Sequence, residues 1–263
     1  MINNKSVVVT GAGRGIGRAI ASKLSEKGYN VIVNDILDLE STIQECKENG
    51  VNAIGIKGDI TNDEILQKIK DTVQESKYDL IGVVNNAFSE VRKPFLELTD
   101  EDWHSTLENS FMSAVKVSKN LLPIMIKKKK GSIVNIASVH SFGAGLNFSP
   151  YDSAKAAMIA LTKSIASEFG ESGIRANAVA AGLIITERNQ DKWQPGTRNL
   201  EHVKMAIPVG HPGSTRDIAN IVEFLISDEA SFISGAAIVA DGGMLSLLPE
   251  TVALNIANKM RRS

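Results

Sequence analysis

Short apolar runs rich in β-branched residues alternate along this chain with longer stretches of helical periodicity. The apolar runs predict seven strands, at Ser6–Thr10, Asn30–Asp35, Ala53–Lys57, Leu80–Asn85, Ser132–Ala137, Arg175–Ala180 and Ala236–Ala240. The periodic stretches predict helices at Gly15–Lys27, Leu37–Asn49, Asn62–Ser76, Asp100–Lys130 (as two helices), Tyr151–Glu171 and Thr215–Ser227. Strands that are apolar on both faces are typical of a parallel sheet with helices on each side.

This alternation predicts an α/β fold, a single doubly wound, Rossmann-like domain whose seven-stranded parallel sheet is flanked by helices. No Pro- or Ser-rich linker, low-complexity tract or internal repeat divides residues 1–263, so we expect one domain. The segment from about 186 to 213 differs, because it contains several prolines and glycines and is weakly periodic. An insertion of this kind after a strand predicts a substrate loop or lid.

Composition and charge exclude several classes of protein. The formal net charge is −1, which gives no general attraction to nucleic acid or to an anionic membrane. Cys46 is the only cysteine, so there is no disulfide framework, and the four histidines lack metal-ligand spacing. No apolar run approaches the ~20 residues of a membrane span, and the first ten residues do not resemble a signal peptide. We expect a cytoplasmic protein without a metal and without a nucleic-acid or membrane partner.

A glycine-rich turn, Thr-Gly-Ala-Gly-Arg-Gly-Ile-Gly over residues 10–17, joins the first predicted strand to the first predicted helix. Glycines allow a tight turn, a close approach of the backbone to a pyrophosphate and close packing of the helix on the strand. The helix N-terminus adds free N–H groups and the positive end of a dipole. The turn therefore predicts a dinucleotide site, with contacts from Gly11, Arg14, Gly15, Ile16 and Gly17.

Asp35 ends the second predicted strand, eighteen residues after Gly17. A carboxylate there can accept hydrogen bonds from both adenosine ribose hydroxyls and repels a 2′-phosphate, although Asp35 could instead cap the next helix. Arg14 argues in the other direction, since a guanidinium beside the ribose attracts a 2′-phosphate. The balance favours NAD as the cofactor, with NADP as the alternative. Asp59, after the third strand, is a candidate acceptor for the adenine amino group or another helix cap.

Tyr151 and Lys155 are spaced i, i+4 at the start of a predicted helix, which places the phenol and the ammonium on one face. A free tyrosine has a pKa near 10, so only ~0.1% is phenolate at neutral pH. A nearby ammonium and a positive nicotinamide ring both stabilise the phenolate, so we expect Lys155 and the bound cofactor to make Tyr151 a usable acid and base. The alternative is an ordinary solvated helix face.

Ser138 ends the fifth predicted strand, thirteen residues before Tyr151. Ligands of open α/β sheets bind just beyond the carboxyl ends of the strands. A hydroxyl there can donate to the carbonyl oxygen that Tyr151 would protonate, with Ser141 as a nearby competitor. His140 is expected to face either the substrate or the solvent.

Together these features resemble the short-chain dehydrogenase/reductase family from Thr10 to Gly243. Each matching segment is a weak signal, but their order and spacing are specific. The segments are the glycine turn, Asp59-Ile60-Thr61, Asn85-Asn86-Ala87, Asn109, Ser138, Tyr151 with Lys155, residues 177–182 with Thr186, and Asp241-Gly242-Gly243. The resemblance implies an NAD(P)-dependent oxidoreductase that transfers a hydride between the nicotinamide ring and a secondary alcohol or ketone.

The resemblance also implies roles for single residues. Tyr151 corresponds to the acid and base, and Lys155 to the residue that lowers its pKa and holds the nicotinamide ribose. Ser138 corresponds to the hydroxyl that orients the carbonyl, and Asn109 to the residue that helps to hold a proton-relay water. Further cofactor contacts are implied for Asp59, Ile60, Asn86, Tyr151, Lys155, Ile184 and Thr186. Family members commonly form homotetramers, which we expect here.

Two positions depart from the family pattern. Phe88 follows Asn-Asn-Ala where the family usually has glycine, and Ala181-Gly182 replaces the usual Pro-Gly after the sixth strand. A benzyl side chain forbids conformations that glycine allows, and the loss of proline frees φ, so we expect rearranged loops beside the cofactor and substrate. Only these departures support the rival interpretation, a dinucleotide-binding protein without catalytic activity.

The substrate is left open among three classes. One is a 3-oxoacyl thioester, the substrate of an acyl-carrier-protein reductase of this family. Another is a sugar or sugar acid, because the stretch from Arg92 to Trp103 resembles family members of that kind. The third is a steroid-like or other secondary alcohol.

Overall fold

The computed structural model describes residues 4–194 and 197–260. Within them the central feature is a seven-stranded parallel sheet in the order β3-β2-β1-β4-β5-β6-β9. Its strands are β1 (Lys5–Thr10), β2 (Asn30–Asp35), β3 (Ala53–Lys57), β4 (Asp79–Asn85), β5 (Gly131–Ser138), β6 (Ile174–Ala181) and β9 (Ala237–Ala240). The predicted fold class is confirmed, and every predicted strand end lies within one residue of the observed one.

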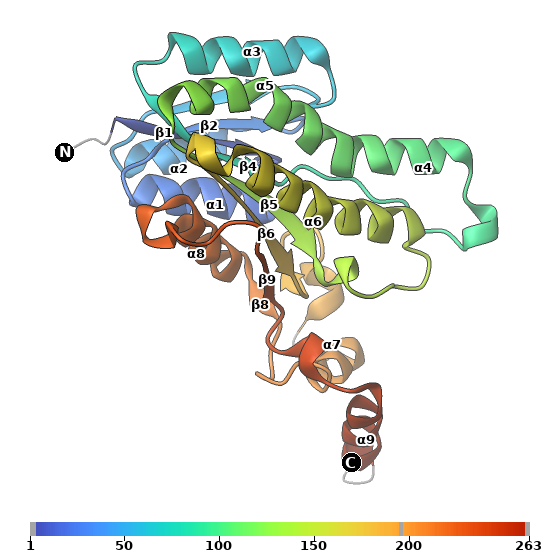
Figure 1. Cartoon of the computed structure of the whole chain (residues 1–263). Coiled ribbons are helices and arrows are strands. Elements are labelled where there is room, and N and C mark those ends of the chain that lie inside the picture. Colours follow the sequence, from blue (N-terminus) through green and yellow to red (C-terminus); the bar gives the residue numbers. More distant parts are fainter. Residues whose placement is uncertain (1–3, 195–196, 261–263) are drawn as a thin grey trace.

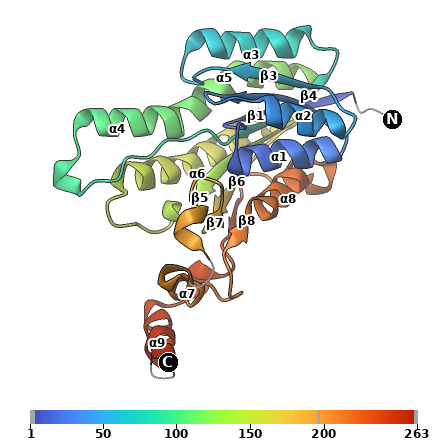
Figure 2. The same cartoon turned by 180° about the vertical axis from the view of Figure 1, so that it is seen from behind.

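Helices cover both faces of this sheet (Figure 1; Figure 2, from behind). On one face lie α1 (Gly15–Glu26), α2 (Glu40–Glu48) and α8 (Thr215–Ile226). On the other lie α3 (Asp63–Glu75), α5 (Ser113–Lys128) and α6 (Ser149–Phe169), with α4 (Asp100–Leu107) packed against α6.

Alternate side chains of each strand enter two separate apolar cores. Val7 and Val9 of β1 pack in the core that contains Ile20 of α1, whereas Val8 packs in the core that contains Leu121 of α5. These three valine side chains and that of Ile20 are fully buried. This two-sided burial explains why the strands have continuous apolar sequences rather than alternating ones.

The strand order reverses between β1 and β4, because β2 and β3 extend the sheet on one side while β5, β6 and β9 extend it on the other. In an open α/β sheet the carboxyl ends of the strands at such a switch point border the ligand crevice. The reversal therefore brings the glycine turn after β1 next to Asn86 after β4.

The stretch from 100 to 130 contains two helices, as predicted, but they are joined without a break. A π-helical turn, Glu108–Met112, lies between α4 and α5 (Ser113–Lys128) and contains Asn109. π turns widen a helix locally and occur often at functional sites. Hydrophobic periodicity gave no sign of this turn.

The segment 186–213 begins and ends beside a small parallel pair of strands, β7 (Ile184–Ile185) and β8 (Gly213–Ser214). It holds a short 3-10 helix, Gln190–Trp193, and α7 (Arg198–Lys204), which the sequence did not predict. Residues 195 and 196 lie outside the described part of the chain. A role of this segment as a substrate loop stays a prediction.

The sequence also did not predict α9 (Pro249–Met260), which projects from the body of the molecule beyond α7 in both views (Figures 1 and 2). Across residues 4–194 and 197–260, no helix has the length and apolar character that a membrane crossing requires.

Candidate active site

A cleft of about 880 Å³ lies over the carboxyl ends of the central strands. The residues predicted for the cofactor and for catalysis come from segments that are far apart in the sequence, and the fold brings them together here. The cleft is lined by Gly11, Arg14, Gly15, Ile16, Asp35, Asp59, Ile60, Asn86, Asn109, Ser138, Tyr151, Lys155, Ile184 and Thr186. Gly17 is buried behind this surface, where it packs on the turn itself.

The glycine turn is fixed to the end of β4 by Thr10 and Asn86. The Thr10 hydroxyl accepts from the backbone N–H groups of Asn86 and Ala87, at 3.1 Å each. The Asn86 amide donates to the carbonyls of Thr10 and Gly11 at 3.1 and 2.9 Å. Asn86 therefore holds the turn in shape in addition to lining the cleft.

Gly11 and Gly17 need to be glycine for different reasons. Gly11 has a φ of +64°, the left-handed region that favours glycine. At Gly17 a Cβ atom would lie 2.1 Å from the carbonyl oxygen of Gly11, which is backbone and cannot move aside.

Gly17→Ala is accordingly expected to disrupt the turn and weaken dinucleotide binding at least ~10-fold, with a loss of stability of about 2 kcal/mol or more. Isothermal titration with NAD and NADP and urea unfolding of the unliganded protein would measure both effects. Gly170→Ala is the matched control, because Gly170 has a helical φ of −56° and no atom lies within 4 Å of its Cβ position. Normal cofactor affinity in the Gly17 variant would contradict the steric argument.

Asp35 lies beside the turn and is not a helix cap. Its Oδ2 accepts from the backbone N–H of Gly13 at 2.8 Å and its Oδ1 from that of Leu37 at 2.9 Å. Helix α2 (Glu40–Glu48) has Leu39 at its N-cap position instead. A carboxylate has about four acceptor sites, so Asp35 can still accept from a ligand.

Asp59 is not a helix cap either. Its Oδ1 accepts from the backbone N–H and the hydroxyl of Thr61, whereas Asn62 caps α3 by accepting from the N–H of Glu64. The cap alternatives for both aspartates are wrong, and both carboxylates line the cleft.

Ser138, Tyr151 and Lys155 meet where β5 (Gly131–Ser138) ends against α6 (Ser149–Phe169). Lys155 is 2% exposed, and its Nζ donates to the carbonyl of Ile136 at 2.7 Å. The same Nζ lies 5.6 Å from the centre of the Tyr151 ring. The Ser138 hydroxyl donates to the Ala181 carbonyl at 3.4 Å and accepts from the N–H of His140 at 3.2 Å. These three side chains line one end of the cleft.

Asn109 lines the same cleft from the π-helical turn. Its side-chain amide donates to the backbone carbonyl of Ser105 at 2.8 Å. The backbone carbonyl of Asn109 accepts from the Ser113 hydroxyl at 2.7 Å. The π turn thus places this residue next to α6, which packs against it.

Comparison with known proteins agrees with this geometry. A family model described as "Enoyl-(Acyl carrier protein) reductase" matches residues 11–245. The 3-oxoacyl-acyl-carrier-protein reductase FabG of Staphylococcus aureus is 35% identical over 245 residues, which are 91% of this chain and 98% of that protein. The chain belongs to the short-chain dehydrogenase/reductase family. It is an NAD(P)-dependent oxidoreductase of that family, as the sequence predicted.

Solved structures of this family have the same fold. A proposed gluconate dehydrogenase from Agrobacterium tumefaciens superposes with a TM-score of 0.88 at 31% identity, over 94% of this chain and 98% of that one. A proposed 2-deoxy-D-gluconate 3-dehydrogenase from the same organism, solved with bound NADP, superposes with a TM-score of 0.84 at 29% identity and the same coverage.

The departures from the family pattern leave the backbone beside the cleft unstrained. Phe88 takes no left-handed conformation, so this position does not need glycine. Its side chain is 42% exposed and forms a wall of the cleft, with the Lys155 Nζ 5.3 Å and the Arg188 guanidinium carbon 5.4 Å from the ring centre. Ala181 continues β6 to its end, and Gly182 is needed because a Cβ there would lie 2.6 Å from the Asp241 Cα.

Burial controls the proton affinities of the central pair in this family member. It raises the pKa of Tyr151 to about 12, against the effect of a hydrogen bond from Ser138, and the charge of Glu90 raises this pKa further. Burial also lowers the pKa of Lys155 to about 8, and Glu90 opposes this change. In the chain without cofactor, desolvation therefore dominates the pKa of Tyr151, and its lowering by Lys155 together with a bound nicotinamide stays a prediction.

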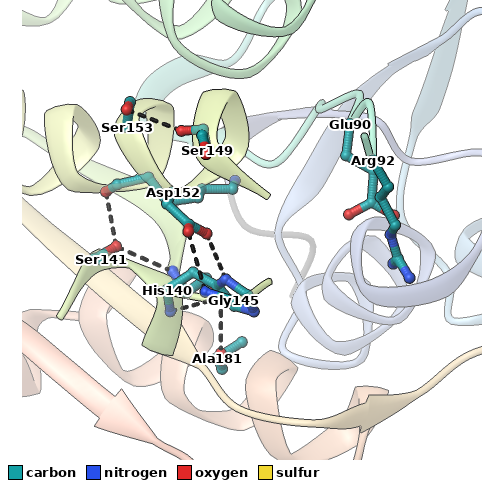
Figure 3. Close-up of polar contacts among 11 residues, drawn as sticks. Glu90, Arg92, His140, Ser141, Gly145, Ser149, Asp152, Ser153 and Ala181 are labelled. Carbon is teal, nitrogen blue, oxygen red and sulfur yellow. Dashed lines mark hydrogen bonds and ion pairs between the residues drawn. The ribbon is translucent and has the colours of Figure 1, made fainter. Parts of the chain in front are cut away.

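Glu90 is a site residue that sequence reasoning missed. Its carboxylate is largely buried and binds Arg92 at 2.8 Å and Arg188 at 3.4 Å. Arg188 belongs to the segment after β7, so the ion pair joins that segment to the loop after β4. Figure 3 shows Glu90 beside Arg92, whose guanidinium carbon lies 4.4 Å from the centre of the Phe148 ring.

Glu187, in the segment after β7, contacts the glycine turn. Its Oε2 accepts from the backbone N–H of Gly15, the first residue of α1, at 3.0 Å. A carboxylate is a natural partner for a helix N-terminus.

No group of three or more metal-ligating side chains occurs among residues 4–194 and 197–260.

Proposed function

We propose that this enzyme interconverts a secondary alcohol and a ketone on a small, hydroxylated and anionic substrate, such as a sugar acid, with Tyr151 as its acid and base. One observation carries the chemistry. Asn109 of the π-helical turn, Ser138 of β5, and Tyr151 and Lys155 of α6 all line a single cleft. The described residues fit a dinucleotide in the same cleft, because Gly11 and Gly15 of the turn line it without side chains of their own and Asp35 lies beside the turn.

NAD(P) supplies or accepts the hydride at its nicotinamide ring. The chain's own residues handle the oxygen and its proton. The Ser138 hydroxyl orients the reacting oxygen, and the Tyr151 phenol donates a proton to it in reduction or removes one in oxidation. The ammonium of Lys155 stabilises the phenolate form, while its hydrogen bond to the Ile136 carbonyl fixes its place.

The charge of the cleft supports an anionic substrate. Arg92, Arg188 and Lys192 line its outer part, and two acidic side chains lie near them. Glu90 is shared between the two arginines, and Glu187 binds the start of α1. Net positive charge remains for a carboxylate group. The structural similarity to gluconate dehydrogenases supports the same class, whereas the similarity to FabG favours a 3-oxoacyl thioester as the second candidate.

A substrate panel separates these candidates. Purified protein would be assayed with NAD and NADP, in both directions, against sugar acids, a 3-oxoacyl thioester and simple secondary alcohols. We expect the highest kcat/KM for a sugar acid. A kcat/KM that is ten-fold or more higher for the thioester would establish the second candidate. Cofactor binding without turnover of any alcohol or ketone would restore the non-catalytic interpretation.

We propose NAD as the preferred cofactor, because the Asp35 carboxylate stands where the adenosine ribose would bind, while Arg14 is exposed beside it. The wild type should have a KM for NAD at least ~10-fold below that for NADP. Asp35→Asn removes the negative charge, so the preference should shrink ~10-fold or more. Asp38→Asn is the matched control, since Asp38 is exposed and its carboxylate accepts from the N–H of Glu40 rather than from the glycine turn. A wild-type preference for NADP would contradict the proposal.

We also propose that the enzyme is a cytoplasmic homotetramer assembled through α4, α5 and α6. Ala156 and Ala160 of α6 are exposed and small enough to allow close approach of another helix. Large apolar side chains are also exposed in the adjoining loops, at Phe95, Leu96, Phe142 and Leu146.

A further inference from the structure

His140 and Asp152 form a pair beside Tyr151 that the roles proposed above do not use. The His140 Nδ1 lies 2.6 Å from the Asp152 Oδ1, and the two side chains are 26% and 14% exposed. The pair joins the loop after β5 to the first turn of α6, and Figure 3 shows the Asp152 carboxylate pointing toward the imidazole.

The surroundings of Asp152 fix which imidazole nitrogen carries the proton. Its second oxygen, Oδ2, accepts from the backbone N–H of Gly145 at 3.1 Å. An ionised carboxylate only accepts hydrogen bonds, so the His140 Nδ1 must donate to it. In the neutral imidazole the other nitrogen, Nε2, then carries a lone pair and is an acceptor.

This Nε2 is left for a ligand. Within residues 4–194 and 197–260, no side chain or backbone group forms a hydrogen bond with it, and His140 lines the cleft. The ring is held between Phe148, at 4.9 Å between ring centres, and Tyr151, at 5.4 Å and edge to face. The backbone N–H of the same residue donates to the Ser138 hydroxyl. The acceptor is therefore held rigidly next to the two groups proposed to bind the reacting oxygen.

We propose that the His140 Nε2 accepts a hydrogen bond from a substrate hydroxyl on the carbon next to the reacting one, and that Asp152 is a positioning residue that holds the required tautomer. The enzyme would then select vicinal diols over alcohols with a single hydroxyl. This inference rests on the proposed function, because it concerns the substrate of the same cleft. It deepens that proposal by assigning hydroxyl recognition to one atom.

Two variants separate the acceptor from the packing of the ring. His140→Phe keeps an aromatic ring against Phe148 and Tyr151 but has no acceptor. Asp152→Asn keeps the shape of the pair and reverses its polarity. The N–H of Gly145 still requires an oxygen, so the asparagine turns its NH₂ group toward the imidazole, Nδ1 becomes the acceptor and Nε2 becomes a donor. Ser153→Ala is the control, since its hydroxyl binds the Ser149 carbonyl on the side of the helix away from His140 (Figure 3).

The enzyme saturated with its preferred cofactor would be assayed with butane-2,3-diol and with butan-2-ol. In the wild type and in the Ser153 control, kcat/KM should favour the diol. In both the His140 and the Asp152 variants, kcat/KM for the diol should fall about 10- to 100-fold, the value of one directed hydrogen bond. The value for butan-2-ol should change less than ~3-fold in the His140 variant. In the Asp152 variant the readout is the ratio of the two alcohols, because the Asp152 charge also raises the pKa of Tyr151 and its loss affects both alcohols equally. An equal fall for both alcohols, or a wild type that does not favour the diol, would overturn the inference.

The tautomer is measured separately by ¹⁵N NMR of the imidazole nitrogens under mildly alkaline conditions, with the His140 variant used for assignment. The wild type should carry its proton on Nδ1 and the Asp152→Asn variant on Nε2. A wild type protonated on Nε2 would overturn the inference even if no alcohol were a substrate. Failure of every alcohol and ketone in the assay would instead contradict the proposed function.

Discussion

Tyr151→Phe is expected to lower kcat about 10³-fold while leaving the fold and the affinity for NAD(P) nearly unchanged. The substitution removes only the hydroxyl that transfers the proton, and positioned acid–base groups contribute between 10²- and 10⁴-fold to rate. Ser138 remains to orient the reacting oxygen, so the KM should change little. Steady-state kinetics with the best substrate from the panel and titration of the cofactor would measure these effects.

Tyr78→Phe is the matched control for this experiment, because Tyr78 lies just before β4 and does not line the cleft. It should keep wild-type kinetics. Turnover within about ten-fold of the wild type in the Tyr151 variant would show that another group transfers the proton, and the proposed role of Tyr151 would be wrong.

Lys155→Met is expected to abolish most activity and to stabilise the unliganded protein at neutral pH. Lys155 is fully buried, and burial lowers its pKa from the usual 10.5 to about 8. By linkage, keeping Lys155 charged in the folded protein at pH 7 costs about 3 kcal/mol of stability. This is an upper limit for the stability gained by the methionine variant, because methionine also leaves the Ile136 carbonyl without its hydrogen-bond donor. We expect a gain of about 1 to 2 kcal/mol and a loss in kcat/KM of ~10²-fold or more.

The pH dependence of this stability difference gives a sharper test. Between about pH 8 and pH 10.5 the unfolded chain keeps the Lys155 proton while the folded protein has released it. At this side chain the unfolded state binds more protons in that range, so Lys155 contributes a rise in the stability of the wild type with pH. The methionine variant lacks this rise, and its advantage should shrink between pH 7 and about pH 10. Cys46 and Tyr151 have raised pKa values and contribute the opposite slope above about pH 9 and pH 10, but both groups are present in both proteins, so the difference between the two proteins reports on Lys155.

Urea unfolding of both proteins at several pH values measures this difference. Lys163→Met is the matched control, because Lys163 lies on the same helix and is exposed, so its replacement should change neither the stability slope nor the activity. An advantage of the Lys155 variant that stayed constant across the pH range would contradict the assignment of the slope to this lysine.

Short-range pattern was enough to predict the sheet. Each of the seven strands contains a short apolar run, and the polar residues and glycines that follow these runs lie where a parallel sheet places a ligand. The same logic located Ser138 at the end of β5 and Tyr151 with Lys155 on one face of α6. These predictions hold because the periodicity of a strand or a helix follows from backbone geometry that neighbouring residues share.

Other parts of the site cannot be predicted from any short stretch of the sequence. The contact of Glu187 with Gly15 joins residues 172 positions apart, and the ion pair of Glu90 with Arg188 joins residues 98 apart. The π turn around Asn109 does not interrupt the apolar pattern of α4 and α5, so periodicity could not reveal it. The sequence indicated His140 as a residue near the substrate, because it follows Ser138 by two residues. It did not indicate that Asp152 would be the partner of His140.

The sequence by itself determined the doubly wound fold, the position of the dinucleotide turn and the family of oxidoreductases to which the chain belongs. It could do so because these depend on residue type at fixed spacing along the chain. The tertiary structure decided the proton affinities of Tyr151 and Lys155, the tautomer of His140 and the charge at the mouth of the cleft. Each of these depends on burial and on partners from distant segments, since the cost of a buried charge is set by everything packed around it.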